Sequence, residues 1–257
     1  MSSLLGPDDP PAFRVFNQRA PADILLLCDH AGKAVPKALH GLGLLERDLN
    51  QHVGWDIGAA QVAERLALLL DAPLLLSAYS RLVIDCNRKL DNPTSIAPVS
   101  DGVEVPGNSN LSAADRAARA EACFWPYHRA IDAAIAGFTA RGVKPAIVII
   151  HSFTPVMNGV ARPWEFGILW DGDRRIAPQL IEALRRDGRL TVGDNQPYSG
   201  SSAHEYTLSA HTKTLDLPRV SIEVRQDLIG DAQGACRWAD ILAPALAEAL
   251  GAELRAL

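Results

Sequence analysis

The sequence lacks the patterns that would place it on a membrane or on nucleic acid. No apolar run approaches the ~18 residues of a membrane span, and residues 1–11 contain no basic segment followed by a long apolar one, so we expect no signal peptide. The net charge is −5 and no basic stripe is present, which argues against an anionic membrane surface or nucleic acid as a partner. We therefore expect a cytoplasmic protein that binds neither.

Cysteine is scarce, and its spacing does not suggest a disulfide framework or a CxxC site. Four cysteines lie far apart, and Cys28 and Cys86 fall in apolar, strand-like runs, which favours reduced core thiols. Repeats and low-complexity tracts are also absent from the sequence. A chain of 257 residues, 48 % of them hydrophobic, is long enough for one large α/β domain. We expect a single domain over residues 1–257, with residues 1–22 as an irregular N-terminal arm.

Two apolar stretches each run into a histidine. Residues 146–150 lead directly to His151, and residues 24–28 are followed closely by His30. Short, unbroken runs of Val, Ile and Leu bounded by turn signals predict strands that are buried on both faces. Open α/β sheets bind their ligands at the carboxyl ends of such strands. Two imidazoles at one edge of a sheet suit a metal site, whereas a capping or core role is the alternative for each histidine alone.

The rest of the chain alternates between expected strands and helices. This order predicts a three-layer α/β fold with a mostly parallel or mixed central sheet and helices on both faces. A polar stretch at residues 89–111 reads as a long surface loop, and loops of that length are often functional lids. We expect further strands at residues 74–77, 80–88, 167–170, 190–192 and 220–225, and helices at 57–70, 112–140 (broken near Pro126), 176–186 and 231–250 (kinked at Pro244).

Three residues match the ligand set of a catalytic zinc site. Such sites are usually held by three ligands drawn from His and Asp or Glu, and His30, Asp56 and His151 fit that inventory. Asp56 directly precedes the helix expected at 57–70, so N-capping of that helix is its alternative role. The cofactor we expect is Zn²⁺.

Glu223 lies within the apolar strand expected at 220–225. Burying a glutamate there is costly unless it is paired or functional, and Glu223 is our candidate for the carboxylate that moves a proton in catalysis. Arg225 lies two residues later and therefore on the same face of the strand, which makes it a second catalytic candidate. A purely structural ion pair of Glu223 with Arg225 or a histidine is the alternative.

A set of short motifs together resembles the N-formylglutamate amidohydrolase family. The resemblance runs from about residue 22 to 245, and each motif is weak alone. It implies a zinc-exopeptidase-like fold, related to zinc carboxypeptidases and bacterial cell-wall amidases. It also implies a zinc-dependent hydrolase that cleaves the amide of an N-formyl or short N-acyl amino acid, such as N-formyl-L-glutamate, to formate and the amino acid. The motifs are His30-Ala-Gly, Ser80-Arg-Leu-Val-Ile-Asp-x-Asn-Arg88, His151-Ser, Arg162-Pro-Trp, Asp194-Asn-x-Pro-Tyr198 and Ile222-Glu-Val-Arg-Gln-Asp227.

The resemblance also implies roles for single residues. Asn87-Arg88 is similar to the Asn-Arg pair with which zinc carboxypeptidases hold a substrate carboxylate, His151-Ser to their second zinc histidine, and Glu223-x-Arg225 to the strand of their catalytic glutamate. One position departs from that pattern, because Lys33 stands where carboxypeptidases have the glutamate ligand of His-x-x-Glu. Cell-wall amidases take their carboxylate ligand from the start of the following helix, so we prefer Asp56 as the third ligand.

The expected partner is a small anionic substrate, because a guanidinium fork grips a carboxylate in two places. His204 and His211 precede the strand of Glu223, and either one is a candidate to approach the metal or the substrate. His52 is expected to order the turn of Asp56. The substrate-binding candidates are Arg81, Asn87, Arg88, Arg162, Tyr198 and His211.

Two alternative functions remain open at this point. A zinc peptidase or cell-wall amidase would use the same scaffold and the same ligands. A metal-free protein that binds small anions would keep the arginines at the strand ends, and Lys33 is the feature that supports it. The presence of His30, His151 and Glu223 favours the metal-dependent hydrolase.

Overall fold

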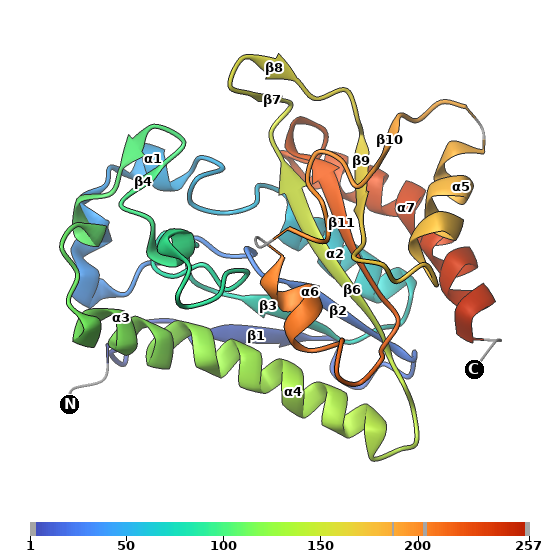
Figure 1. Cartoon of the computed structure of the whole chain (residues 1–257), viewed down its shortest axis with the longest axis horizontal. Helices are drawn as coiled ribbons and strands as arrows, with labels where there is room; N and C mark the ends of the chain where they lie inside the picture. The colour runs from blue at the N-terminus through green and yellow to red at the C-terminus, as the bar shows by residue number, and fades with distance from the viewer. Residues whose placement is uncertain (1–3, 187, 203–204, 255–257) are drawn as a thin grey trace.

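The computed structural model describes residues 4–186, 188–202 and 205–254. A seven-stranded sheet in the order β1-β3-β2-β6-β11-β9-β10 lies between two layers of helices (Figure 1). Strands β3, β2, β6 and β11 run parallel to one another, whereas β1 is antiparallel to β3 and β9 is antiparallel to β11. This arrangement confirms the predicted three-layer α/β fold with a mixed sheet. The strands are β1 (Phe13–Phe16), β2 (Ile24–Cys28), β3 (Leu74–Ser77), β6 (Ala146–Phe153), β9 (Phe166–Leu169), β10 (Val192–Asp194) and β11 (Arg219–Arg225).

The apolar runs of the central strands serve two cores. In β2, Leu26 and Cys28 pack under one helical layer, whereas Leu25 and Leu27 pack under the other, as the alternation of side chains along a strand requires. Helices α2 (Ala59–Leu69), α5 (Ala177–Arg185) and α7 (Ala232–Leu254) cover the first face, and α4 (Trp125–Thr139) and α6 (Tyr206–Ala210) cover the second. Because both faces are covered, the strands need no polar face, and this explains their unbroken Val, Ile and Leu runs.

Shorter elements surround one end of the sheet. Two hairpins, β4–β5 and β7–β8, lie at different places around it (Figure 1). A third apolar cluster, which includes Leu42, Ile84 and Phe124, packs beneath these loops. The elements are α1 (Glu46–Leu49), α3 (Ala113–Arg119), β4 (Val99–Ser100), β5 (Val103–Glu104), β7 (Val156–Met157) and β8 (Val160–Ala161), with 3₁₀ turns η1 (Lys37–Gly43), η2 (Pro93–Ile96), η3 (Pro106–Asn108) and η5 (Gln226–Leu228) and the π-helical turn η4 (Ala120–Phe124).

Two sequence-based expectations about the strands were wrong. The arm expected at residues 1–22 contains β1, which extends the sheet at its edge. Residues 80–88 form turns rather than a strand. In that segment the Val83 and Arg88 amides donate back to the Ser80 and Asp85 carbonyls. The side chains of Leu82, Val83 and Ile84 pack into the cluster beneath the loops, whereas Cys86 packs against the sheet in the second core.

Helix boundaries followed local signals closely. Ser112 and Asp115 form a reciprocal capping box at the start of α3, a pattern typical of helix N-termini. The break expected near Pro126 is the π-helical turn η4 just before it, and Pro126 lies in the first turn of α4. Pro244 lies inside α7. Among the described residues, none of the helices has both the length and the apolar character needed to cross a bilayer.

Candidate metal centre and active site

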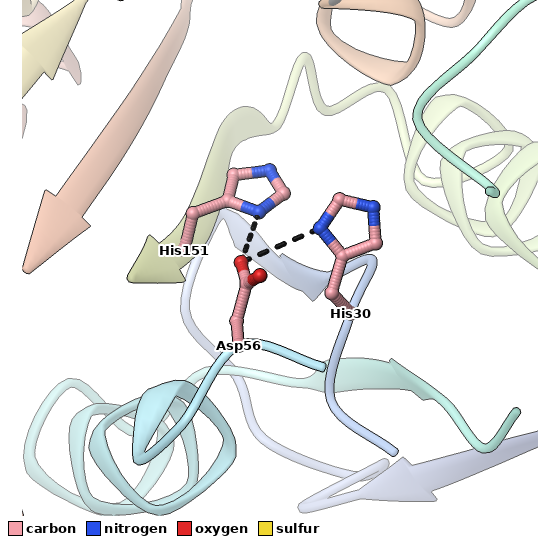
Figure 2. A group of neighbouring side chains, drawn as sticks. All are labelled: His30, Asp56 and His151. Carbon is pink, nitrogen blue, oxygen red and sulfur yellow. Dashed lines mark hydrogen bonds and ion pairs between the residues drawn. The ribbon is translucent and has the colours of Figure 1, made fainter. Parts of the chain in front are cut away.

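The three predicted metal ligands meet at the carboxyl end of the central strands. His30 lies two residues beyond β2, His151 lies in β6, and Asp56 lies between them on the turn before α2 (Figure 2). Asp56 Oδ2 is 2.9 Å from His151 Nδ1 and 3.4 Å from His30 Nδ1. All three residues are buried, and their donor atoms lie within 4.8 Å of one another. The structure thus brings the predicted ligand set together.

The backbone that carries these residues depends on two glycines. Gly58 has φ +79° and acts as the N-cap residue of α2, and a Cβ at this position would lie 2.1 Å from the Ile229 carbonyl oxygen. Gly32 lets the loop after His30 run against the chain at Ala78, where a Cβ would lie 2.1 Å from the Ala78 carbonyl oxygen. The Asp56 amide donates to the His30 carbonyl at 3.0 Å, so the two ligand-bearing turns are joined directly.

Asp56 does not cap α2. The helix begins at Ala59, and the Asp56 carboxylate turns away from it toward the two imidazoles. It also accepts a hydrogen bond from the Ser152 amide at 3.2 Å. A carboxylate with this surrounding is oriented as a ligand and not as a helix cap, so the alternative considered for Asp56 is not supported.

A second carboxylate lies near Nε2 of each histidine, the ring nitrogen that does not face Asp56. His30 Nε2 lies 2.7 Å from Asp85 Oδ1, and His151 Nε2 lies 3.5 Å from Asp29 Oδ2. Tyr127 donates to the other oxygen of Asp29 at 2.9 Å. Carboxylates in this position hold an imidazole in one orientation and in one tautomer, with the opposite nitrogen directed at a metal. The residues therefore fit a divalent ion such as zinc, with Nδ1 of both histidines as donors.

Arg81 pairs with carboxylates around the metal centre instead of extending toward a substrate. Its guanidinium donates to Asp85 Oδ2 from Nη2 at 2.8 Å and from Nε at 3.2 Å, and to Asp56 Oδ1 from Nη1 at 3.3 Å. Burial alone would raise the pKa of Asp85, but the charges of Arg81 and His30 outweigh it and hold that pKa well below its usual range. Although Arg81 lines the cavity, as a substrate-binding residue would, its charge is directed at two site carboxylates.

Glu223 lies next to the ligands. It pairs in register with His151 on the adjacent strand, and it is buried. Its Oε2 has no hydrogen-bond partner among the described residues. Burial raises the pKa of Glu223 to about 8, with a further contribution from the carboxylates of Asp56 and Glu205. A bound cation would oppose this shift, so the position suits a carboxylate that gains and loses a proton during turnover.

A cavity of about 370 Å³ opens over these groups. Arg81, Asn87, Arg88 and Tyr198 line it together with the ligands and Glu223. Asn87 is held rigidly, because its Oδ1 accepts from the Thr207 amide at 2.9 Å. Four of the six predicted substrate-binding residues therefore reach the cavity.

Arg225 and His211 do not line the cavity, and Arg162 reaches it only through Tyr198. Arg225 donates from Nε to Asp227 at 2.8 Å and from Nη1 to the carbonyls of residues 162–164. It therefore braces the chain before β9, and its expected catalytic contact is corrected. Arg162 donates to the Tyr198 hydroxyl at 3.0 Å. Sharing a strand face with Glu223 did not bring Arg225 to the site, because β11 ends at Arg225 and its guanidinium is bound to Asp227 and to the carbonyls of residues 162–164.

His211 belongs to a separate buried chain of hydrogen bonds. Its Nε2 lies 2.7 Å from Nδ1 of His128, and its Nδ1 lies 2.7 Å from the Asp132 carboxylate. His128 in turn contacts the Cys86 carbonyl at 3.0 Å. The expected substrate contact of His211 is therefore corrected. His204 lies outside the described residues. His52 pairs with Asp101 at 2.8 Å across the rim of the cavity.

Several site residues were missed by the sequence analysis. Asp29 and Asp85 were read only as parts of motifs, although a carboxylate one residue before His30 is a signal for an orienting group. Glu205 lines the cavity and is buried, but it lies in a stretch with no periodic pattern. Nothing in the local sequence marks Glu205 as different from a surface glutamate.

The family model of N-formylglutamate amidohydrolase (FGase) matches residues 22–230. The chain belongs to the N-formylglutamate amidohydrolase family. The match covers every residue of the site described above.

Two solved structures are similar to this chain. The gene product Atu2144 from Agrobacterium tumefaciens is 36 % identical, with a TM-score of 0.93 over 96 % of this chain and 98 % of that one. An N-formylglutamate amidohydrolase from Ralstonia eutropha JMP134 is 18 % identical, with a TM-score of 0.71 over 96 % of this chain and 100 % of that one, and shares the fold. Among curated proteins no match was found.

Proposed function

We propose that the protein is a zinc-dependent amidohydrolase that cleaves the amide of an N-formyl or short N-acyl amino acid. Family membership supports the reaction class. The observation that carries the proposal is the buried group of His30, Asp56 and His151 beside the buried Glu223, whose Oε2 has no hydrogen-bond partner in the described part of the chain. Amide hydrolysis at a metal site requires both a ligand set and a proton carrier, and these residues supply both.

The residues divide the reaction between them. A zinc ion held by His30, Asp56 and His151 would supply Lewis acidity, which polarises the amide carbonyl and acidifies water. Glu223 takes a proton from the attacking water as the water oxygen bonds to the acyl carbon. Glu223 then delivers that proton to the leaving nitrogen as the C–N bond breaks, so formate and a free amine result. The rigid Asn87 and the adjacent Arg88 are placed to bind the substrate carboxylate.

Metal content and formate release test this proposal together. We expect about one zinc per chain in the wild-type protein and far less in His30→Ala, measured by elemental analysis after washing. Glu223→Gln should keep the metal and lose turnover by about 10²–10⁴-fold, because it removes the proton carrier and leaves the ligands intact.

Two results would contradict the proposal. A wild-type protein that holds no zinc after zinc is supplied would remove the metal mechanism, and a Glu223→Gln protein with normal turnover would remove Glu223 from its role. Dipeptides and muropeptides belong in the same substrate panel, because faster cleavage of either would replace the N-formyl amino acid with a peptidase or cell-wall amidase substrate.

A further inference from the structure

The charges that line the cavity are unevenly matched. Among the described residues, five carboxylates line it, against two guanidiniums. A substrate with two carboxylates, such as N-formylglutamate, needs two cationic partners besides the metal ligands if neither carboxylate is to be left beside like charge. The carboxylates are those of Asp56, Asp85, Asp101, Glu205 and Glu223, and the guanidiniums are those of Arg81 and Arg88.

The guanidinium of Arg81 is already bound to two carboxylates of the metal centre. It donates three hydrogen bonds to Asp85 and Asp56, at 2.8 to 3.3 Å. Moving it toward a substrate carboxylate would leave two buried carboxylates without their shared partner, which is strongly unfavourable. Of the two guanidiniums that line the cavity in the described part of the chain, the one outside this hydrogen-bonded group is that of Arg88, whose Nη1 donates to the Asn87 carbonyl at 3.0 Å.

Glu205 lies beside this anion-binding position. It is only 7 % exposed and lines the cavity. Burial raises the pKa of Glu205, whereas the charges of His151 and Arg88 and the neighbouring Asn87 amide act against that rise. Its Oε2 is buried and has no hydrogen-bond partner among the described residues. A buried acceptor without a donor is costly, so a ligand that brings an N–H group to Oε2 gains that hydrogen bond, whereas a second ligand carboxylate meets repulsion.

We propose that Glu205 is a specificity-determining residue that selects an N-formyl or short N-acyl amino acid with one carboxylate and an uncharged, carboxamide-bearing side chain over a dicarboxylate. This inference rests on the proposed amidohydrolase function and narrows its substrate class. The α-carboxylate binds at Arg88, and the side-chain carboxamide donates to Glu205 Oε2.

N-formyl-L-glutamine and N-formyl-L-glutamate are a matched pair for the test, because they differ at the side-chain terminus alone. We expect the zinc-loaded, full-length protein to prefer the glutamine compound by at least about tenfold in kcat/KM, measured as formate release, since a buried hydrogen-bonding group discriminates strongly against a ligand that lacks its partner. Glu205→Gln should abolish or reverse this preference, because its carboxamide donates to a carboxylate and carries no charge.

Asp101→Asn is the matched control. It also removes a carboxylate of the cavity lining, but one that pairs with His52 at the rim, so the ratio of the two kcat/KM values should stay at the wild-type value. Glu205→Ala gives a second variant that lacks the acceptor, in case Glu205→Gln folds poorly. It should also lose the preference for glutamine.

The outcomes separate this inference from the proposed function. Faster cleavage of the glutamate compound by the wild-type protein, or an unchanged ratio in a folded Glu205 variant, would overturn the role of Glu205 and leave the amidohydrolase standing. If the wild-type protein cleaves neither compound, the proposed function fails. Calorimetric titration of both compounds into the zinc-loaded protein then decides the inference, because equal binding or tighter binding of the glutamate compound would refute it.

Discussion

Asp85→Asn should weaken zinc binding without touching a ligand. Asp85 Oδ1 lies 2.7 Å from His30 Nε2, and Asp85 Oδ2 accepts from Arg81. The amide has nearly the same shape but no charge, so the imidazole of His30 loses the group that fixes its orientation and raises its basicity. Loss of such an orienting group typically reduces metal affinity 10–100-fold, which corresponds to about 1.4–2.7 kcal/mol at 1.36 kcal/mol per decade.

The structure places this variant toward the upper end of that range. Arg81 divides its hydrogen bonds between Asp85 and Asp56. When the charge of Asp85 is removed, the guanidinium retains Asp56 as its charged partner, and a stronger pull on Asp56 Oδ1 reduces the electron density available from Asp56 as a ligand. The one substitution therefore weakens two of the three donors.

Competition with a chromophoric zinc chelator measures the change. Asp101→Asn is the control, since it makes the same substitution in another histidine–aspartate pair of the cavity, but His52 is not in the ligand group. We expect its zinc affinity to equal that of the wild-type protein. An Asp85→Asn protein that binds zinc as tightly as the wild type, or a control with an equal loss, would refute the orienting role of Asp85.

Three further predictions concern stability, measured by urea unfolding of the zinc-free protein. Leu66→Ala empties a fully buried position on α2 and should cost about 2–5 kcal/mol; a loss below 1 kcal/mol would show that the core collapses there. Ser112→Ala removes the capping box of α3 and should cost about 1 kcal/mol, whereas Ser109→Ala outside the helix should cost little. Burial lowers the pKa of His128 from 6.5 to about 4. As the pH drops from 6.5 to 4, the His128 imidazole is therefore protonated in the unfolded chain before it is protonated in the folded one. The free energy of unfolding falls over this range. His128→Gln should be less stable than wild type at pH 7, with the gap narrowing by about 3 kcal/mol at pH 4; a constant gap would contradict this.

The parts of the fold that could be predicted are those encoded by local patterns. Strands β2 and β6 are unbroken Val, Ile and Leu runs because helices cover both faces of the sheet, and no other common arrangement buries such runs. Parallel strands bring their carboxyl ends to one edge, so His30 and His151 were expected together. The capping box of α3 is likewise contained within a few residues.

The parts that could not be predicted depend on tertiary contacts. Residues 80–88 have the composition of a strand, but the hydrogen bonds of Ser80 to Gly54 and of the Asp85 amide to Ser95 fold them into turns. Arg225 was expected at the site, yet the carbonyls before β9 draw it away. Side-chain direction at a strand end depends on which partners lie nearby, and sequence spacing does not contain that information.

Arg81 shows why substrate charge was the hardest property to infer. An arginine near predicted zinc ligands suggests an anion-binding group, and both Arg81 and Arg88 were therefore substrate-binding candidates. In the structure Arg81 is hydrogen-bonded to Asp56 and Asp85, whereas the positive charge of Arg88 acts on both Asp85 and Glu205. Metal affinity and substrate charge preference are thereby assigned to different residues. Asp85→Asn should change zinc affinity most, and Glu205→Gln should change the ratio of glutamine to glutamate compound most. If one variant changed both equally, the division between the ligand shell and the specificity position would be wrong.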